Sequence, residues 1–233
     1  MKVVILAGGY GTRLSEYTKK IPKPMVKILN IPILERIIKH YSNYKFREFI
    51  IAGGYKEKII RDYFKNRLKH LDIKIINTGI KTMTGGRLKR LSNFLQDETF
   101  MMTYGDGLSD INLKKLLKFH YKNKKKVTMT AVRPPARFGY LKLKGNEVKY
   151  FKEKSKTEEG WINGGFFVME PNFLKYIKKD STYLEREPLE NLAKKRGLAA
   201  FQHKGFWQCM DTLRDKNNLE KLLKKNKYKK IFD

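Results

Sequence analysis

Residues 2–14 read KVVILAGGYGTRL, an apolar run that passes directly into a glycine-rich turn. The apolar part, Val3 to Ala7, is short and continuous, as expected of a strand that is buried on both faces of a parallel sheet. The three glycines that follow would let backbone N–H groups surround an anion, and Thr12 and Arg13 add a hydroxyl donor and a permanent cation. The stretch therefore predicts a phosphate-binding turn at the end of a first β-strand.

This turn differs from two well-known phosphate loops. A Walker loop needs Gly-Lys followed by Ser or Thr, which is absent here. A dinucleotide fingerprint needs a third glycine where this chain has Leu14, and an acidic residue for the ribose, which the second apolar run at residues 49–54 lacks. On the loop alone, a glycine turn without any ligand stays open as the alternative.

Apolar runs alternate with helical patterns along the whole chain. Strands are predicted at residues 3–7, 49–52, 73–76, 99–104, 127–132, 164–169 and 198–203, with an antiparallel pair at 141–143 and 148–150. Helices are predicted at residues 33–41, 59–64, 88–95, 113–120, 172–177 and 184–195, with a last helix from residue 211. This rhythm predicts a Rossmann-like α/β fold of three layers, in which helices flank a mostly parallel or mixed sheet and the second half is elaborated. Because the chain has no repeat and no low-complexity linker, we expect residues 1–233 to form a single domain.

The composition allows such a domain and excludes several other classes of protein. With 233 residues and 41% hydrophobic content, the chain can bury a core without disulfides or a structural metal. Its single cysteine, Cys209, cannot form an internal disulfide, and its four histidines show no zinc-binding spacing. No apolar run is long enough for a membrane span or a signal peptide, so we expect a cytoplasmic protein without membrane insertion.

The formal net charge of +29 raises the question of a nucleic-acid partner. The charge is spread evenly, because residues 1–120 hold 24 basic and 10 acidic side chains and residues 121–233 hold 28 and 13. The lysine runs at residues 122–126 and 224–230 follow apolar-periodic segments, where lysines most often form a solvated face or a helix end. We therefore expect no specific nucleic-acid binding, but electrostatic attraction of phosphorylated substrates.

Three charged residues beyond the turn are suited to phosphate chemistry. The prolines on both sides of Lys23 predict an extended segment that holds its ammonium group in place, although a rigid loop with a surface lysine is the simpler alternative. Asp106 lies between two glycines at the end of a predicted strand, at the sheet edge where the glycine turn also emerges. There it could hold Mg²⁺, which takes one or two carboxylates and completes its shell with substrate phosphates. Asp211 is the second candidate ligand, with capping of the last helix as the alternative.

Several longer sequence motifs occur along the chain in addition to these residues. In chain order they are GGYGTRL from residue 8, PKPM from residue 22, MTGGRLKR from residue 83, YGDG from residue 104, RFG from residue 137, Glu153-Lys154, INGGFF from residue 162, FWQ from residue 206 and MDTLRD from residue 210. Together they make the chain resemble the sugar-1-phosphate nucleotidyltransferases over nearly its whole length. MTGGRLKR, INGGFF and MDTLRD favour the cytidylyltransferase branch of that family, whose members use glucose 1-phosphate.

The resemblance implies roles for individual residues. It implies that the catalytic residues are Arg13, Lys23, Asp106 and Asp211, of which the two aspartates would hold Mg²⁺. It implies that the nucleotide contacts Leu6, Gly8, Gly9, Gly11, Thr12, Gly85, Gly86 and Arg87. It implies that the sugar phosphate contacts Gly139, Glu153, Lys154, Asn163 and Gly164. Residues 1–132 would then form the nucleotide-binding core, and residues 133–233 the sugar-phosphate-binding part and the C-terminal helix.

The reaction that the resemblance implies is Mg²⁺-dependent transfer of CMP from CTP to α-D-glucose 1-phosphate. Its products are diphosphate and CDP-glucose, a precursor for bacterial surface polysaccharides such as the lipopolysaccharide O-antigen. The nucleophile is a phosphate oxygen that is largely ionised near neutral pH, so no general base is required, and none of the Ser-His-Asp or Cys-His type is apparent. The site instead has to align two anions and neutralise the charge that passes to diphosphate. Another nucleoside triphosphate, another phosphorylated acceptor, or a non-catalytic nucleic-acid-binding role are the alternatives.

One interval departs from the family's pattern. The cytidylyltransferases carry a long insertion between the helix that ends near Phe64 and an Asp-Thr-Gly string, where this chain has only residues 65–76 before Asn77-Thr78-Gly79. The resemblance implies a homo-oligomer, and the short interval puts in question the nucleotide contacts or subunit packing that the insertion provides elsewhere. For four aromatic residues we expect core packing in preference to ligand stacking: Trp161, Phe166, Phe167 and Trp207.

Overall fold

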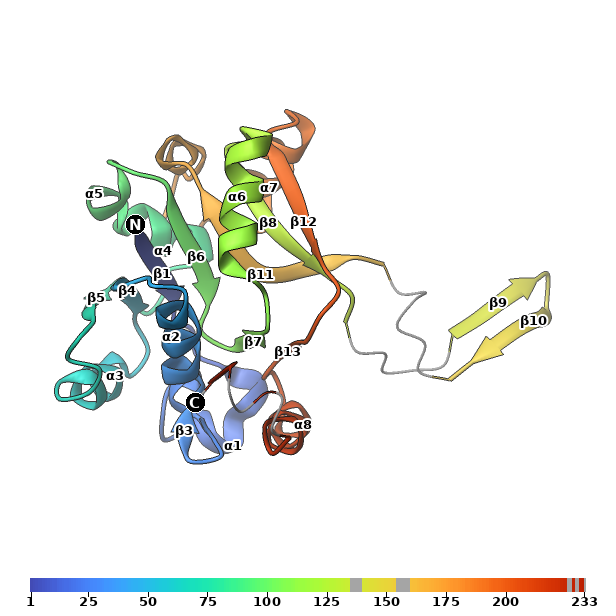
Figure 1. Ribbon diagram of the computed structural model, residues 1–233, viewed down its shortest axis with the longest axis horizontal. Coiled ribbons are helices and arrows are strands. Elements are labelled where there is room, and N and C mark those ends of the chain that lie inside the picture. The colour runs from blue at the N-terminus through green and yellow to red at the C-terminus, as the bar shows by residue number, and fades with distance from the viewer. Residues whose placement is uncertain (135–139, 154–159, 226–227, 229–230, 233) are drawn as a thin grey trace.

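A seven-stranded sheet forms the centre of the computed structural model, which describes residues 1–134, 140–153, 160–225, 228 and 231–232 (Figure 1). In the order β12-β8-β11-β6-β1-β4-β5, its strands are Leu198–His203, Val127–Val132, Ile162–Met169, Phe100–Tyr104, Lys2–Leu6, Glu48–Gly53 and Asp72–Asn77. Within this sheet β11 runs antiparallel to its neighbours β6 and β8, and the other pairs are parallel. The predicted mixed α/β sheet is confirmed.

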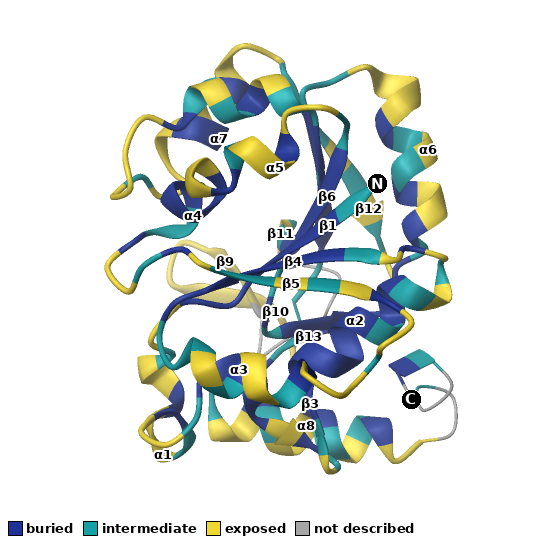
Figure 2. Ribbon diagram, turned by 90° about the vertical axis from the view of Figure 1, so that its left-hand side faces the viewer, coloured by how far each residue is buried: buried dark blue, intermediate teal, exposed yellow. Residues whose placement is uncertain are grey.

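Helices cover both faces of the sheet, which gives the three predicted layers (Figure 2). One face packs against α2 (Ile33–Asn43), α3 (Glu57–Phe64) and α6 (Leu113–Asn123), and the core on this side also includes residues of α8 (Leu213–Leu223). The other packs against α4 (Thr84–Arg90), α5 (Ser92–Leu95), the 3₁₀ helix η3 (Pro171–Tyr176) and α7 (Glu187–Lys194). The short helix α1 (Ser15–Thr18) follows the glycine turn. Among the described residues, no helix has the length and apolarity to cross a membrane.

Strand β1 shows why its sequence is continuously apolar. Val3 and Ile5 belong to the core beneath α2, whereas Val4 and Leu6 belong to the core on the opposite face. Successive side chains of a strand point to opposite faces, so a strand with helices on both sides needs apolar residues at every position. The strand is an interior strand of the sheet, with β6 on one side and β4 on the other.

Most of the predicted helices are present with ends shifted by two or three residues, and three differences stand out. The helix expected at 88–95 begins earlier and is interrupted at Leu91, so that α4 and α5 are separate. The helix expected at 172–177 is the 3₁₀ helix η3. The helix expected at 184–195 begins only at Glu187, since Pro188 occupies its first turn, where the missing N–H of proline costs no hydrogen bond.

Four short strands lie outside the main sheet and were not predicted. β2 (Lys27–Ile28) pairs with β3 (Ile31–Pro32), and β7 (Gly107–Ser109) pairs with β13 (Trp207–Cys209). Strands of two or three residues are too short to show a hydrophobic period. The pairing of β7 with β13 nevertheless decides the geometry of the site described below.

The antiparallel pair expected near Gly145 is present. It consists of β9 (Tyr140–Lys144) and β10 (Glu147–Lys152), and Gly145 in the turn adopts φ +61°, which favours glycine. This hairpin projects from the body of the molecule (Figure 1).

The short interval at residues 65–76, where the cytidylyltransferases have an insertion, leaves the sheet intact. Residues 65–71 connect α3 to β5, and β5 pairs along its whole length with β4. At the end of β5, the Asn77 side-chain oxygen accepts a hydrogen bond from the Gly79 N–H at 2.8 Å. An aspartate oxygen would accept the same hydrogen bond, so the turn tolerates asparagine where the family's pattern has aspartate.

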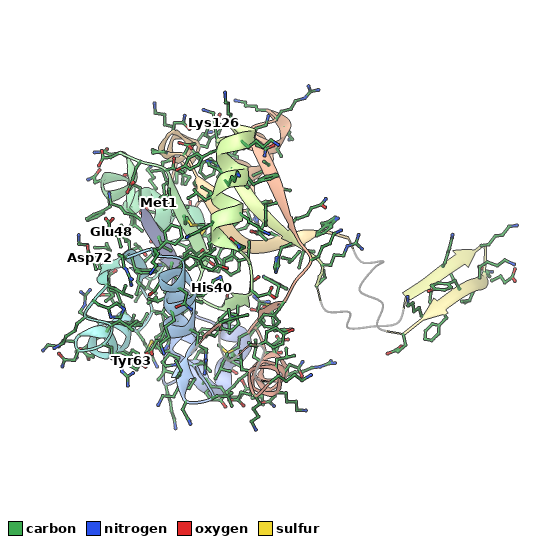
Figure 3. The ribbon with its side chains drawn as sticks, viewed as in Figure 1. Met1, His40, Glu48, Tyr63, Asp72 and Lys126 are labelled. Carbon is green, nitrogen blue, oxygen red and sulfur yellow. The ribbon has the colours of Figure 1, made fainter. Side chains whose placement is uncertain are left out.

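His40 is a buried imidazole in α2, in the interior of the molecule (Figure 3). Its ring contacts Tyr41, Tyr44 and Phe232. Burial lowers the pKa of His40 from 6.5 to about 4, although the nearby Asp110 carboxylate opposes the shift. The imidazole is therefore neutral in the folded protein at any pH well above 4.

This burial predicts a loss of stability in mild acid. Between pH 6.5 and 4 the unfolded chain binds a proton at His40 that the folded chain does not, so the free energy of unfolding falls as the pH is lowered, by about 3 kcal/mol at pH 4. Urea unfolding at several pH values measures how the free energy of unfolding depends on pH. His40→Leu should weaken this dependence between pH 6.5 and 4, while the exposed control His70→Leu should leave it unchanged. The same pH dependence in wild type and His40→Leu would contradict the prediction.

Candidate active site

The two predicted metal ligands lie side by side because two short strands pair. Asp106 stands immediately before β7, and Asp211 follows shortly after β13. The antiparallel register places Gly107, the first residue of β7, opposite Cys209, the last residue of β13. The two aspartates next to these strand ends are therefore brought together. The Met210 N–H donates to the backbone oxygen of Asp106 at 2.8 Å and holds the two loops together.

The Lys23 ammonium group joins the two aspartates. Its Nζ lies 2.6 Å from Asp106 Oδ2 and 2.6 Å from Asp211 Oδ1, and the lysine side chain is 11% exposed. The predicted extended conformation of Lys23 is wrong, since residues Lys23–Met25 form the 3₁₀ helix η2. Pro22 is extended, but Pro24 lies within the first turn, where the fixed φ of proline suits a helical backbone.

Arg13 adds a second cation to the cluster. It projects from the 3₁₀ helix η1 (Thr12–Leu14), and its Nη1 lies 2.8 Å from Asp211 Oδ2. Burial favours a neutral Lys23, but the carboxylates of Asp106 and Asp211 outweigh it and raise the pKa of Lys23 above 10.5. Burial likewise favours a neutral Asp211, but hydrogen bonding and charge from Lys23, with Arg13, lower its pKa below 3.8. At neutral pH the cluster therefore holds two cations and a charged Asp211.

The alternative role for Asp211, capping the last helix, is not the one observed. Thr212 caps α8, and its Oγ1 accepts a hydrogen bond from the Asp215 N–H at 3.2 Å. The Asp215 carboxylate accepts one in return from the Thr212 N–H at 2.9 Å. This capping box satisfies the start of the helix and leaves the Asp211 side chain for the lysine and the arginine.

The glycine turn faces the same cavity as the aspartates. The cavity has a volume of about 1190 Å³, and Leu6, Gly8, Gly9, Gly11 and Thr12 line it together with Asp106 and Asp211. Gly11 adopts φ +66°, and a Cβ there would lie 2.9 Å from both the Lys23 Cβ and the Thr18 Cγ2. Glycine is thus required at position 11 both by the backbone conformation and by the close approach of Lys23.

Arg87 lies beneath the turn. The residue is 4% exposed, and its guanidinium donates to the Thr78 hydroxyl at 2.7 Å and to the backbone oxygens of Gly8, Gly79 and Gly53 at 2.8, 2.8 and 3.0 Å. These acceptors follow or end strands β1, β4 and β5. Arg87 also borders the cavity, so a direct nucleotide contact stays a prediction, but its observed partners make it the support of the phosphate turn.

Gly85 and Gly86 serve a close packing contact. A Cβ on Gly86 would lie 2.1 Å from the Asp180 backbone oxygen, and one on Gly85 would lie 2.8 Å from the Thr182 backbone oxygen. The start of α4 thus lies directly against the segment before Leu184. Neither glycine lines the cavity, although the neighbouring Met83 and Thr84 do, and the predicted contact of the two glycines with nucleotide stays a prediction.

Part of the predicted sugar-phosphate side is present in the same cavity. Asn163 lines it, and its side-chain NH₂ donates to the Tyr104 hydroxyl at 3.4 Å. Gly164 is buried, and its backbone oxygen accepts a hydrogen bond from the Trp207 indole at 2.7 Å. Glu153 follows β10 on the projecting hairpin and does not line the cavity. Gly139 and Lys154 lie outside the described residues.

The aromatic residues divide between core and cavity. Phe166 and Phe167 are buried in the two cores, as expected. Trp207 packs against one core and also lines the cavity, so core packing describes only one side of its ring. Trp161 is partly exposed and stacks with the Arg133 guanidinium, 4.9 Å from the ring centre.

Glu185 was not singled out in the sequence, yet it connects the two sides of the cavity. One carboxylate oxygen accepts from the Tyr104 hydroxyl at 2.5 Å and the other from the Thr84 hydroxyl at 2.7 Å. Burial and the Glu185 carboxylate raise the pKa of Tyr104, which therefore stays a neutral hydrogen-bond donor. Glu185 lies in an irregular segment with no motif of its own, so no local signal could have revealed this link.

Comparison with known proteins identifies the family of this chain. The family model described as Nucleotidyl transferase matches residues 2–212. The chain belongs to the nucleotidyl transferase family. Among its relatives, glucose-1-phosphate cytidylyltransferase of Salmonella typhimurium is 46% identical over an alignment of 250 positions that covers 97% of each chain. Mannose-1-phosphate guanylyltransferase 1 of Arabidopsis thaliana is 30% identical and covers 92% of this chain and 62% of its own length.

The fold of this nucleotidyltransferase also matches solved structures. HddC from Yersinia pseudotuberculosis, complexed with GMP-PN, superposes with a TM-score of 0.76 at 26% identity, covering 95% of this chain and 99% of that one. The family resemblance carried by the sequence motifs is confirmed. The Salmonella alignment is longer than the 233-residue chain, so that enzyme has residues without a counterpart here.

The contacts of Arg87 predict a large effect of a conservative substitution. Lysine cannot reproduce the planar fork of donors, so Arg87→Lys should leave buried carbonyl oxygens unpaired and lower the free energy of unfolding by about 2 kcal/mol. The same variant should raise the KM for nucleotide, since the glycine turn loses its support. Urea unfolding and steady-state kinetics measure both effects. The exposed Arg47→Lys is the matched control, and equal stability of the two variants would refute the supporting role.

Proposed function

We propose that the protein catalyses transfer of CMP from CTP to α-D-glucose 1-phosphate, with CDP-glucose and diphosphate as products. The observation that carries the proposal is the convergence of two carboxylates and two cations beside a glycine turn in one cavity. Such a cluster suits the alignment of two anionic substrates. The choice of base and sugar rests on the higher identity to the cytidylyltransferase, 46%, than to the guanylyltransferase, 30%.

The donor atoms fit a magnesium ion. Asp106 and Asp211 offer hard oxygen ligands that already surround one cation, the Lys23 ammonium. Among the described residues no group of three His, Cys, Asp or Glu side chains forms a metal cage, so the ion would need oxygens from substrate as well. That is the usual mode for Mg²⁺ in phosphoryl-transfer sites, where the ion neutralises charge on the phosphates.

The chain's own residues would carry the remaining tasks. The backbone N–H groups of the glycine turn would bind the triphosphate, and Arg13 and Lys23 would neutralise charge as it passes from the α-phosphorus to the leaving diphosphate. The attacking oxygen belongs to the glucose 1-phosphate, which is largely ionised at neutral pH, so no side chain needs to remove a proton. Asn163, which lines the cavity, would orient the sugar phosphate for in-line attack. The resemblance assigns the same task to Lys154 and to Glu153, although Glu153 does not line the cavity.

The cellular setting is part of the proposal. We infer that the enzyme works in the cytoplasm as a homo-oligomer, without a specific nucleic-acid partner, and that its CDP-glucose supplies surface polysaccharide such as the O-antigen. The even spread of the +29 charge supports a role in gathering anionic substrates rather than a dedicated polyanion-binding surface.

A substrate panel tests the reaction. The purified protein is incubated with Mg²⁺, each of the four nucleoside triphosphates, and several sugar 1-phosphates, and diphosphate release is measured. We expect the highest kcat/KM for CTP with glucose 1-phosphate. A preference for another pair would assign the same chemistry to other substrates, while specific RNA or DNA binding at physiological salt without diphosphate release would favour the non-catalytic alternative.

Asp106→Asn tests the metal-binding carboxylate. The amide keeps the shape of the side chain but removes its charge, so kcat should fall at least about a hundred-fold. Steady-state kinetics at saturating Mg²⁺ measure the loss, and Asp97→Asn on the exposed surface serves as control. Undiminished turnover of Asp106→Asn would remove this residue from the site.

A further inference from the structure

The Lys23 ammonium lies between the carboxylates that would bind the metal. It is 2.6 Å from one oxygen of each aspartate, which means that two of its three hydrogens point at the proposed ligand atoms. A divalent ion coordinated by the same two oxygens would have to approach closer than the ammonium does, at about 2.1 Å. Two cations cannot share that space, so metal and ammonium compete for the aspartates.

The charges of the cluster reinforce this competition. Lys23 and Arg13 already provide a positive charge for each of the two carboxylates, Asp106 and Asp211. A divalent ion entering without an anion would meet two nearby cations and no unpaired carboxylate. A triphosphate changes the balance, because it brings several negative charges that can pair with both the ion and the lysine.

The lysine stem shows where the ammonium can go. The Lys23 side chain is 11% exposed, and its Cβ and Cδ lie against Gly11 in the glycine turn. The stem is therefore held beside the phosphate-binding turn and cannot extend freely into solvent. An anion bound by the turn is the nearest partner for which the ammonium could leave the aspartates.

We propose that Lys23 is a built-in counter-ion that blocks the metal site until a triphosphate draws it away. This inference rests on the proposed function, because it takes Asp106 and Asp211 as the metal ligands. Divalent cation and nucleoside triphosphate then bind with positive coupling, and by linkage each strengthens the other to the same degree. The free protein binds the metal weakly, although its two carboxylates are already in place.

The decisive experiment measures Mn²⁺ binding without nucleotide, by the electron paramagnetic resonance signal of the free ion. Lys23→Met removes the competing ammonium and nearly preserves the stem, so it should bind one Mn²⁺ at least ten-fold more tightly than wild type. Lys20→Met, on the exposed surface nearby, should match wild type. The double variant Lys23→Met/Asp106→Asn should not show the tighter Mn²⁺ binding of Lys23→Met. Equal Mn²⁺ affinity of wild type and Lys23→Met would overturn the proposal.

A second measurement does not depend on the folding of Lys23→Met. Asp106→Asn removes one of the two carboxylates that bind the Lys23 ammonium. CTP in the presence of EDTA should therefore bind this variant more tightly than wild type, as measured by calorimetry. Weaker or equal binding would overturn the proposal. Neither readout requires turnover, so failure of CDP-glucose synthesis with the expected Mn²⁺ behaviour would reject the substrates and leave the counter-ion role intact.

Discussion

The shared ammonium group of Lys23 is the interaction on which the cleft depends. It joins an N-terminal 3₁₀ helix, the turn after β6 and the segment after β13, which are far apart in the sequence. A buried cation is tolerated only when charged partners replace its water, and the two aspartates do so with short hydrogen bonds. The same contacts occupy one oxygen of each aspartate in the free protein.

Arg87 plays a complementary part under the glycine turn. Carbonyl oxygens gather where the parallel strands end at one edge of the sheet, and the Arg87 guanidinium binds three of them, from the end of β4 and from the residues after β1 and β5. The turn is thereby supported by a cation, and its backbone N–H groups would bind the anion in the proposed reaction. The proposed reaction needs such an arrangement of charge and no proton-abstracting base, because the attacking phosphate oxygen is already largely ionised.

Long, regular patterns allowed much of the fold to be predicted. The apolar run of β1 and the helical spacing of α2 and α6 each extend over enough residues to be recognised, and all three elements occur where expected. The strands β7 and β13, with three residues each, carry no period and were missed. Their pairing is a long-range contact, and it is what brings Asp106 to Asp211.

The sequence by itself determined the α/β class, the glycine turn and the identity of the charged residues, because these depend on local composition and spacing. Only the tertiary structure decided how those residues are used. It showed Lys23 in a 3₁₀ turn between two carboxylates, Gly85 and Gly86 as packing contacts, and Glu185 as a bridge between Thr84 and Tyr104. The physical reason is that charge pairing and close packing depend on distances between segments remote in the chain, which no local pattern records.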